Sequence, residues 1–99
     1  MQIRFFATIR ECTGVSELRW DEPTATVGEL LRALSTRYGP AFRRWVLEEG
    51  DLGSAVLVVI NGHDSRHHGG IHAPLHPDDL IAIFPMIAGG GGRACGWSE

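Results

Sequence analysis

An α+β fold, with one mixed sheet and one main helix packed on one face, is predicted by three features of the sequence. The chain opens with two short segments of alternating hydrophobicity, it contains one strongly signalled helix, and two apolar strand-like segments follow that helix. A doubly wound sheet would need several helical crossovers, and only one is well signalled here. A single main helix on one face of a mixed sheet is the arrangement of the β-grasp fold.

The first segments predict a β-hairpin. Residues 1–8 alternate, so that Phe5 points toward the core and Phe6 points outward. The letters ECTG (11–14) are a turn signal, and VSELRW (15–20) alternates again. We therefore expect two antiparallel strands joined directly by this turn.

The main helix has the clearest local signal in the chain. Thr26 and Glu29 are spaced as a capping box, in which the Thr26 hydroxyl accepts from the Glu29 N–H and the Glu29 carboxylate accepts from the Thr26 N–H. Apolar residues then recur at helical spacing, which predicts one buried stripe over about three turns. The stripe consists of Val27, Leu30, Leu31, Leu34 and Tyr38. Gly39 and Pro40 end the helix.

The second half of the sequence predicts a short helical turn and two more strands. Phe42, Trp45 and Val46 share one face of the turn. SAVLVVING (54–62) is typical of a buried strand that ends in an Asn-Gly turn. Residues 66–79 are rich in Gly, Pro and His and predict an irregular loop, which leads into a last strand, LIAIFP.

Composition and charge narrow the class of protein. Of the 99 residues 43% are hydrophobic and 21% are charged, and the net charge of −3 gives nucleic-acid binding no electrostatic basis. The apolar runs are too short to span a membrane, and the first residues do not form a secretory leader. We therefore expect a soluble cytoplasmic protein with neither nucleic-acid nor membrane partners. Cys12 and Cys95 are expected to be free thiols in such a reducing compartment.

Four consecutive glycines, Gly89, Gly90, Gly91 and Gly92, follow the last apolar segment, and RACGWSE comes after them. We expect residues 1–88 to form the domain and residues 89–99 to form a flexible arm with a removable extension. A glycine segment is thin and conformationally permissive, so it can pass through a narrow channel of a partner. Four extended residues reach about 13 Å, enough to carry a chain end into a pocket.

Five stretches of the chain together resemble a known family. They are IRFFATIRECTG, TVGELLRAL, LVVING, PLHPDDLIAIFP and AGG, in this order and covering nearly all of residues 1–90. In these respects the sequence resembles the ubiquitin-like sulfur carriers of the MoaD/ThiS type, which include the small subunit of molybdopterin synthase. The AGG of that family falls on Ala88, Gly89 and Gly90.

The resemblance implies a carrier whose C-terminal Gly-Gly carboxylate is adenylated with ATP by an E1-like adenylyltransferase and then converted to a thiocarboxylate. The sulfur would pass to a pterin precursor held by the large subunit of molybdopterin synthase, or to another acceptor enzyme. The chain would bind no cofactor, because the activating partner uses the ATP. It would act as a sulfur-donating subunit without a catalytic site of its own.

One departure from the family is the segment beyond the glycines. With Gly91 and Gly92 in place, Gly90 carries an amide instead of a carboxylate, and an amide cannot be adenylated. We therefore expect a processing peptidase to cut after Gly90 or after Gly92, so that either Gly89–Gly90 or Gly91–Gly92 becomes the reactive end. Three alternatives remain: a ubiquitin-like protein modifier, a sulfur carrier for cysteine, thiamine or other metabolite synthesis, and a β-grasp interaction domain without an activated terminus.

An apolar patch is expected at the root of the arm. If the first and last strands are neighbours, Phe6, Phe84 and Met86 lie together on the outer face, with Ala88 at the start of the arm. This patch is the predicted binding surface for the activating enzyme and the acceptor. The alternative is a strand bulge that turns one ring inward. The histidines in and around the 66–79 loop fit no zinc-ligand spacing, and we expect them to be solvated and to bind no metal.

Overall fold

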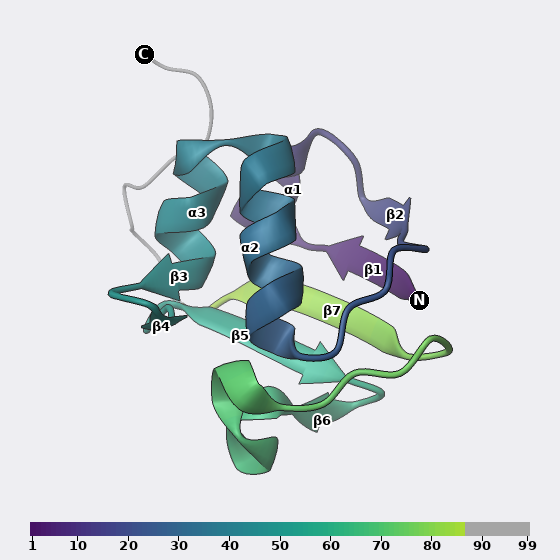
Figure 1. Ribbon diagram of the computed structural model, residues 1–99. Coiled ribbons are helices and arrows are strands. Elements are labelled where there is room, and N and C mark those ends of the chain that lie inside the picture. Colours follow the sequence, from purple (N-terminus) through teal and green to yellow (C-terminus); the bar gives the residue numbers. More distant parts are fainter. Residues whose placement is uncertain (87–99) are drawn as a thin grey trace.

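The computed structural model describes residues 1–86 and consists of one mixed sheet with helices on one face (Figure 1). Its strands are β1 (Gln2–Phe5), β2 (Glu17–Arg19), β3 (Leu47–Glu48), β4 (Asp51–Leu52), β5 (Val56–Ile60), β6 (His63–Asp64) and β7 (Leu80–Pro85). Its helices are α1 (Ala7–Thr13), α2 (Val27–Tyr38) and α3 (Pro40–Val46), with two 3₁₀ turns, η1 (Ser65–His68) and η2 (Gly70–His72).

The five-stranded sheet has the order β2-β1-β7-β5-β6, and β3 and β4 form a separate two-stranded hairpin. β1 and β7 are parallel, with Ile3 opposite Ile81, while β7 and β5 are antiparallel, with Ile83 opposite Val58. The last strand among residues 1–86, β7, therefore lies at the centre of the sheet. This mixed sheet confirms the predicted β-grasp arrangement. The proposed boundary at residue 88 lies outside the described residues.

The core lies between the sheet and α2, as the apolar stripe of the sequence predicts. The stripe residues Leu30, Leu31 and Leu34 are fully buried, and they face the inward residues of the central strands. Ile3, Phe5, Val56, Val58, Ile81 and Ile83 are those inward residues, each at most 1% exposed. The strict alternation of these positions along three strands assigns every other residue of β1, β5 and β7 to the outer face.

The cap of α2 forms as predicted in one of its two hydrogen bonds. The Glu29 N–H donates to the Thr26 hydroxyl oxygen over 3.3 Å. The Glu29 carboxylate, however, accepts from the Ala25 N–H (2.9 Å), one residue before the expected donor. The segment before α2 is extended and pairs with residues 73–75, with the Leu75 N–H donating to the Ala25 carbonyl oxygen. This pairing fixes the backbone before α2, and the second hydrogen bond of the capping box therefore forms with a different donor from the one expected.

The predicted hairpin between residues 1 and 20 is only partly correct. β1 and β2 are antiparallel neighbours, with Ile3 opposite Leu18, but α1 separates them where a bare turn was expected. The helix has no side-chain cap at its start, and Ile9 is its one buried residue, so its sequence carries little helical periodicity. Its end is marked by Gly14, which has a φ of 78° and whose N–H donates to the Arg10 carbonyl oxygen.

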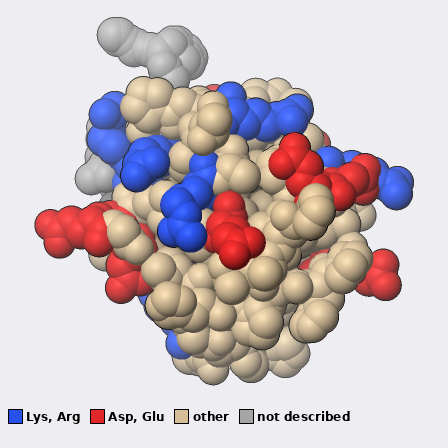
Figure 2. Space-filling model, in the orientation of Figure 1, with Lys and Arg blue, Asp and Glu red and all other residues tan. Residues whose placement is uncertain are grey.

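Basic side chains gather over the upper part of the helical side, and acidic side chains lie beside them at the centre and at both edges of the view (Figure 2). Arg32 and Arg37 of α2, and Arg43 and Arg44 of α3, are all exposed. Glu49 and Asp51 are exposed at the β3–β4 hairpin. Neither sign of charge dominates the molecule, since the whole chain carries a net charge of only −3.

Gly53, just before β5, is held where no larger residue fits. A Cβ built on Gly53 would lie 2.3 Å from the Trp45 carbonyl oxygen, and the Gly53 N–H donates to the Val46 carbonyl oxygen over 2.9 Å. We expect Gly53→Ala to lower the free energy of unfolding by about 2–3 kcal/mol, because the backbone of α3 must move to admit the methyl group. Urea denaturation measures this loss.

Gly50→Ala is the matched control for this substitution. A Cβ at Gly50 meets no atom within 4 Å, so its cost comes only from the φ of 79°. That cost is about 1 kcal/mol. Equal losses for the two variants would contradict the steric argument at Gly53.

Candidate functional site

Two aromatic rings stack at the end of β7 from which the arm continues. The ring centroids of Phe6 and Phe84 are 4.3 Å apart, and the ring planes differ by 11°. The Phe6 N–H donates to the Ile83 carbonyl oxygen over 3.1 Å, which joins the end of β1 to β7. The Phe6 side chain remains 37% exposed, so the stack lies on the surface and outside the core.

The position of the Phe6 ring follows from an abrupt change of backbone direction. Phe6 is extended, with a φ of −125°, and Ala7 immediately starts α1 with a φ of 54°. A non-glycine residue in the left-handed region is strained, and such strain is concentrated at functional sites. The chain therefore turns from strand to helix without a loop, and the ring of Phe6 stays on the outer side of the sheet.

The apolar surface extends beyond the two rings. In the β5–β7 ladder Leu57 lies opposite Phe84 and Val59 lies opposite Ala82, and directly opposed residues point to the same face of a sheet. All four are partly exposed. We call the surface formed by Phe6, Leu57, Val59, Ala82, Phe84 and Met86 the outer apolar face. A continuous apolar surface of this kind is typical of an interaction site.

The structure brings together most of the residues that the sequence singled out here. Phe6 and Phe84 are in contact, and neither ring turns inward, so the predicted face is correct for both. Met86 follows β7 directly, is 49% exposed, and its N–H donates to the Ala55 carbonyl oxygen over 2.7 Å. Ala88 and the glycines Gly89, Gly90, Gly91 and Gly92 lie outside the described residues.

Leu57 and Val59 belong to this face and were not predicted from the sequence. Residues 56–60 are apolar at every position, which indicates only a buried strand. A signal was nevertheless available, because a sheet covered by helices on one face leaves alternate residues of a central strand on the other face. An apolar residue at each of those alternate positions then indicates a surface that a partner covers.

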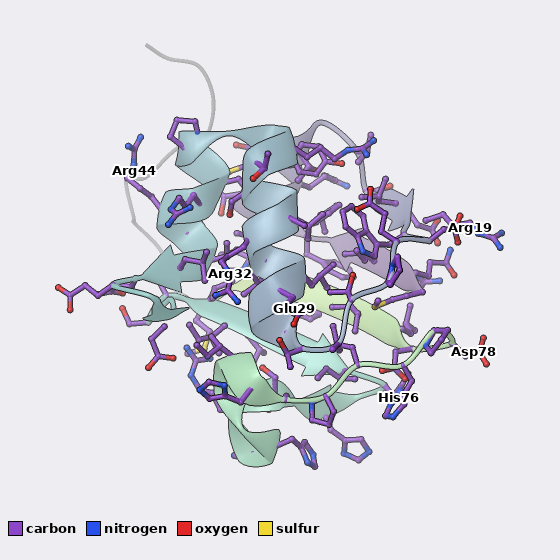
Figure 3. All side chains as sticks on the ribbon, in the orientation of Figure 1. Arg19, Glu29, Arg32, Arg44, His76 and Asp78 are labelled. Atoms are coloured by element: carbon purple, nitrogen blue, oxygen red, sulfur yellow. The ribbon has the colours of Figure 1, made fainter. Side chains whose placement is uncertain are left out.

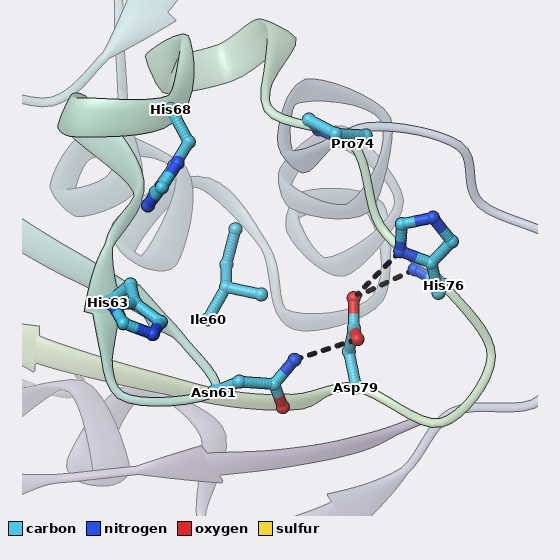
Figure 4. Close-up of a pocket in the computed structure, with 7 residues that line it drawn as sticks. All are labelled: Ile60, Asn61, His63, His68, Pro74, His76 and Asp79. Atoms are coloured by element: carbon cyan, nitrogen blue, oxygen red, sulfur yellow. Dashed lines mark hydrogen bonds and ion pairs between the residues drawn. The ribbon is translucent and has the colours of Figure 1, made fainter.

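A hollow at the opposite end of β7 gathers three of the histidines. Its volume is about 430 Å³, and His63, His68 and His76 line it together with Ile60, Asn61, Pro74 and Asp79. Figure 3 shows His76 and Asp78 on the loop that leads into β7, and Figure 4 shows the hollow in close-up. The imidazole rings of His63 and His68 are edge to face, 5.7 Å apart.

The polar groups of this hollow form hydrogen bonds that hold the adjoining turns in place. The buried Asp79 carboxylate accepts from the Asn61 side-chain amide (2.9 Å) and from the His76 N–H (2.8 Å). The Asn61 side-chain oxygen in turn accepts from the Leu80 N–H. Within residues 1–86 no group of three His, Cys, Asp or Glu side chains is arranged to hold a metal ion. These contacts align the start of β7 with the end of β5.

The predicted free thiol at Cys12 is wrong, because Cys12 is disulfide-bonded in the structure. Cys12 lies in α1, which the sequence analysis did not predict, and packs half-buried against the core. The other cysteine, Cys95, lies outside the described residues. None of the helices among residues 1–86 has the length and apolar character needed to cross a membrane.

Known proteins share both this fold and much of the sequence. Small archaeal modifier protein 3 of Haloferax volcanii is 36% identical over 91 residues, which cover 91% of this chain and 98% of that protein. The solution structure of small archaeal modifier protein 1 from Methanosarcina acetivorans superposes with a TM-score of 0.77 at 31% identity, covering 90% of this chain and 94% of that one. The crystal structure of the BexX/CysO complex of Amycolatopsis orientalis contains a chain with a TM-score of 0.73 at 28% identity, covering 90% and 98%.

These neighbours have the ubiquitin fold, in agreement with the mixed sheet and the packed helix described above. The sequence model of the ThiS family matches residues 3–90, which is nearly the whole described domain and the first two glycines. The chain therefore belongs to the ThiS family, whose members are ubiquitin-fold proteins of the sulfur-carrier and modifier type.

Proposed function

We propose that this chain is a sulfur carrier whose reactive group is the carboxylate of Gly90, exposed when a peptidase removes residues 91–99. The observation that carries the proposal is the extent of the family match, which ends at residue 90, the second glycine after β7. Gly90 is preferred over Gly92 for the same reason. The outer apolar face at the root of the arm is the proposed docking surface for the enzymes that use this carboxylate.

The proposed activation needs little from the carrier beyond an unobstructed chain end. A carboxylate oxygen of Gly90 attacks the α-phosphorus of ATP in the active site of an E1-like adenylyltransferase, and pyrophosphate leaves. A sulfur nucleophile at the oxidation level of hydrosulfide (HS⁻) then attacks the carbonyl carbon of the acyl adenylate. AMP leaves with the electron pair of the C–O bond, and the sulfur loses its proton. The product is a thiocarboxylate. The only side chains that adjoin the reacting carbon are hydrogens, so partner groups can approach closely.

The acceptor that we propose first is a pterin precursor bound to a large subunit like that of molybdopterin synthase. The CysO relative supports a partner enzyme of some kind, because it was solved in a complex with BexX. A second function, protein modification, is favoured by the name of the 36% identical relative, a small archaeal modifier protein. In that case an amine of a target protein replaces the sulfur nucleophile at the same acyl adenylate.

Intact-mass measurement of the protein from its own cells tests the proposal. We expect a species that ends at Gly90, together with a heavier form that differs by the replacement of one oxygen by sulfur. Blotting for conjugates of higher mass separates the carrier from the modifier. A full-length chain that delivers sulfur without losing residues 91–99 would contradict the proposed processing.

A further inference from the structure

The cationic side chains of this protein are all of one kind. The nine Lys and Arg residues of the sequence are all arginines. Eight of them lie within residues 1–86, and every one of the eight is exposed. The blue surface over α2 and α3 in Figure 2 is therefore made of guanidinium groups. A guanidinium group stays protonated and delocalises its charge, so it does not act as the amine nucleophile that a lysine provides.

The α-amine of Met1 is the one primary amine in these 99 residues, and it is held by a hydrogen bond within the fold. Its nitrogen donates to the Trp20 carbonyl oxygen over 3.0 Å, and the Met1 carbonyl oxygen accepts from the Trp20 N–H over 2.8 Å. Met1 is half-buried, and its side chain packs against the core. To act as a nucleophile, this amine must lose both its proton and its contact with Trp20.

The same amine also lies at the wrong end of the sheet for the activated glycine of its own chain. The Gln2 N–H donates to the Asp79 carbonyl oxygen, so β1 begins beside the start of β7. Met86 comes seven residues after Asp79 along extended chain, a distance of about 23 Å. Gly90 comes four residues after Met86, and four residues reach at most about 14 Å. The activated end therefore cannot reach its own amine while β7 is intact.

We infer that this protein is a one-way acyl donor: its glycine acyl group passes to other molecules, while the protein itself offers no competent amine to receive one. This inference rests on the proposed function. In the excluded reaction an amine nitrogen of a second copy would attack the acyl carbon, forming a C–N bond as AMP leaves and a proton is released. Two consequences follow. The activated carrier does not consume itself at high concentration, and any modified acceptor carries one copy per acceptor amine, without chains.

The first experiment measures amine reactivity on the full-length chain and does not depend on activation. An N-hydroxysuccinimide ester is added to the folded protein and to the protein in urea, and labelled peptides are identified by mass spectrometry. We expect the Met1 amine to react about tenfold more slowly in the folded chain, the factor that one hydrogen bond of ordinary strength provides. Equal rates in the two states would overturn the shielding of Met1.

The second experiment uses Arg44→Lys as the matched variant. Arg44 is exposed on α3 and points away from the body in Figure 3, and lysine keeps its charge. When the trimmed chain is activated alone with its adenylating enzyme and ATP, we expect self-linked dimers from Arg44→Lys and none from the natural sequence. Dimers from the natural sequence at the rate of the variant would overturn the inference. Failure of the proposed function is distinguishable from failure of this inference. If the chain is not activated at all, no pyrophosphate is released, whereas the labelling of the Met1 amine in the first experiment is unaffected.

Discussion

Valine at both Gly89 and Gly90, in a chain trimmed at residue 90, is expected to slow adenylation and sulfur transfer at least about a hundredfold. The reason is geometric: a displacement of about 1 Å at a reacting centre costs about this factor. A β-branched side chain adds two methyl groups beside the reacting carbon and restricts the backbone of the arm. The melting temperature should not change, because these residues follow the domain.

The measurement is ATP–pyrophosphate exchange with the activating enzyme, followed by the intact mass of the thiocarboxylate. A chain of residues 1–92 is the control for the position of the reactive end, and we expect it to be activated poorly, since its terminus overshoots by two residues. Full-speed transfer by the valine variant would rule out a glycine end as the acyl donor. Equal activation of the 1–90 and 1–92 chains would remove the preference for Gly90.

Phe84→Arg is expected to weaken binding to the activating enzyme by at least about thirtyfold, the effect of losing about 2 kcal/mol at a central aromatic contact. The ring of Phe84 stacks on Phe6 at the outer apolar face, so the substitution places a charge where the partner would bury an apolar surface. Folding should suffer little. The loss of stability should be about 1 kcal/mol, the contribution of one aromatic pair.

Ile83→Ala is the matched control, because Ile83 is the neighbouring residue of the same strand and points the other way. It is fully buried, and its truncation should lower the free energy of unfolding by about 2–5 kcal/mol while leaving the outer apolar face in place. Titration calorimetry with the activating enzyme and thermal denaturation distinguish the two effects. A large loss of stability in Phe84→Arg, with unchanged affinity, would show that the outer face is structural.

The parts of the fold that the sequence predicts well are those with strong local signals. The start of α2 at Thr26 and the limits of β7 at residues 80–85 are confirmed, because a capping residue and a bounded apolar run are read within a few positions. α1 was missed because it begins at a strained Ala7 and is held by its neighbours, which no local pattern records. The disulfide at Cys12 was missed because the free thiol was inferred from the expected reducing compartment, and no local pattern in the sequence tests that inference.

For the candidate site too, the sequence predicts the features that depend on local pattern and misses those that depend on strand pairing. Alternation places the rings of Phe6 and Phe84 on one face, and that much follows from sequence alone. Their stacking does not, because it depends on the parallel pairing of β1 with β7, two strands at opposite ends of the sequence. Leu57 and Val59 join the face only through their register with β7. The full set of residues on the outer apolar face is therefore determined by the pairing of distant strands, which local periodicity does not reveal.

The central position of β7 has a mechanical consequence. A machine that grips this protein by its C-terminal end pulls first on a strand that is flanked by β1 on one side and by β5 on the other. The load falls on both ladders together and along the strand direction, so their hydrogen bonds must shear at once instead of unzipping one after another. The end that we propose for the chemistry is thus also an end from which the domain resists being pulled apart.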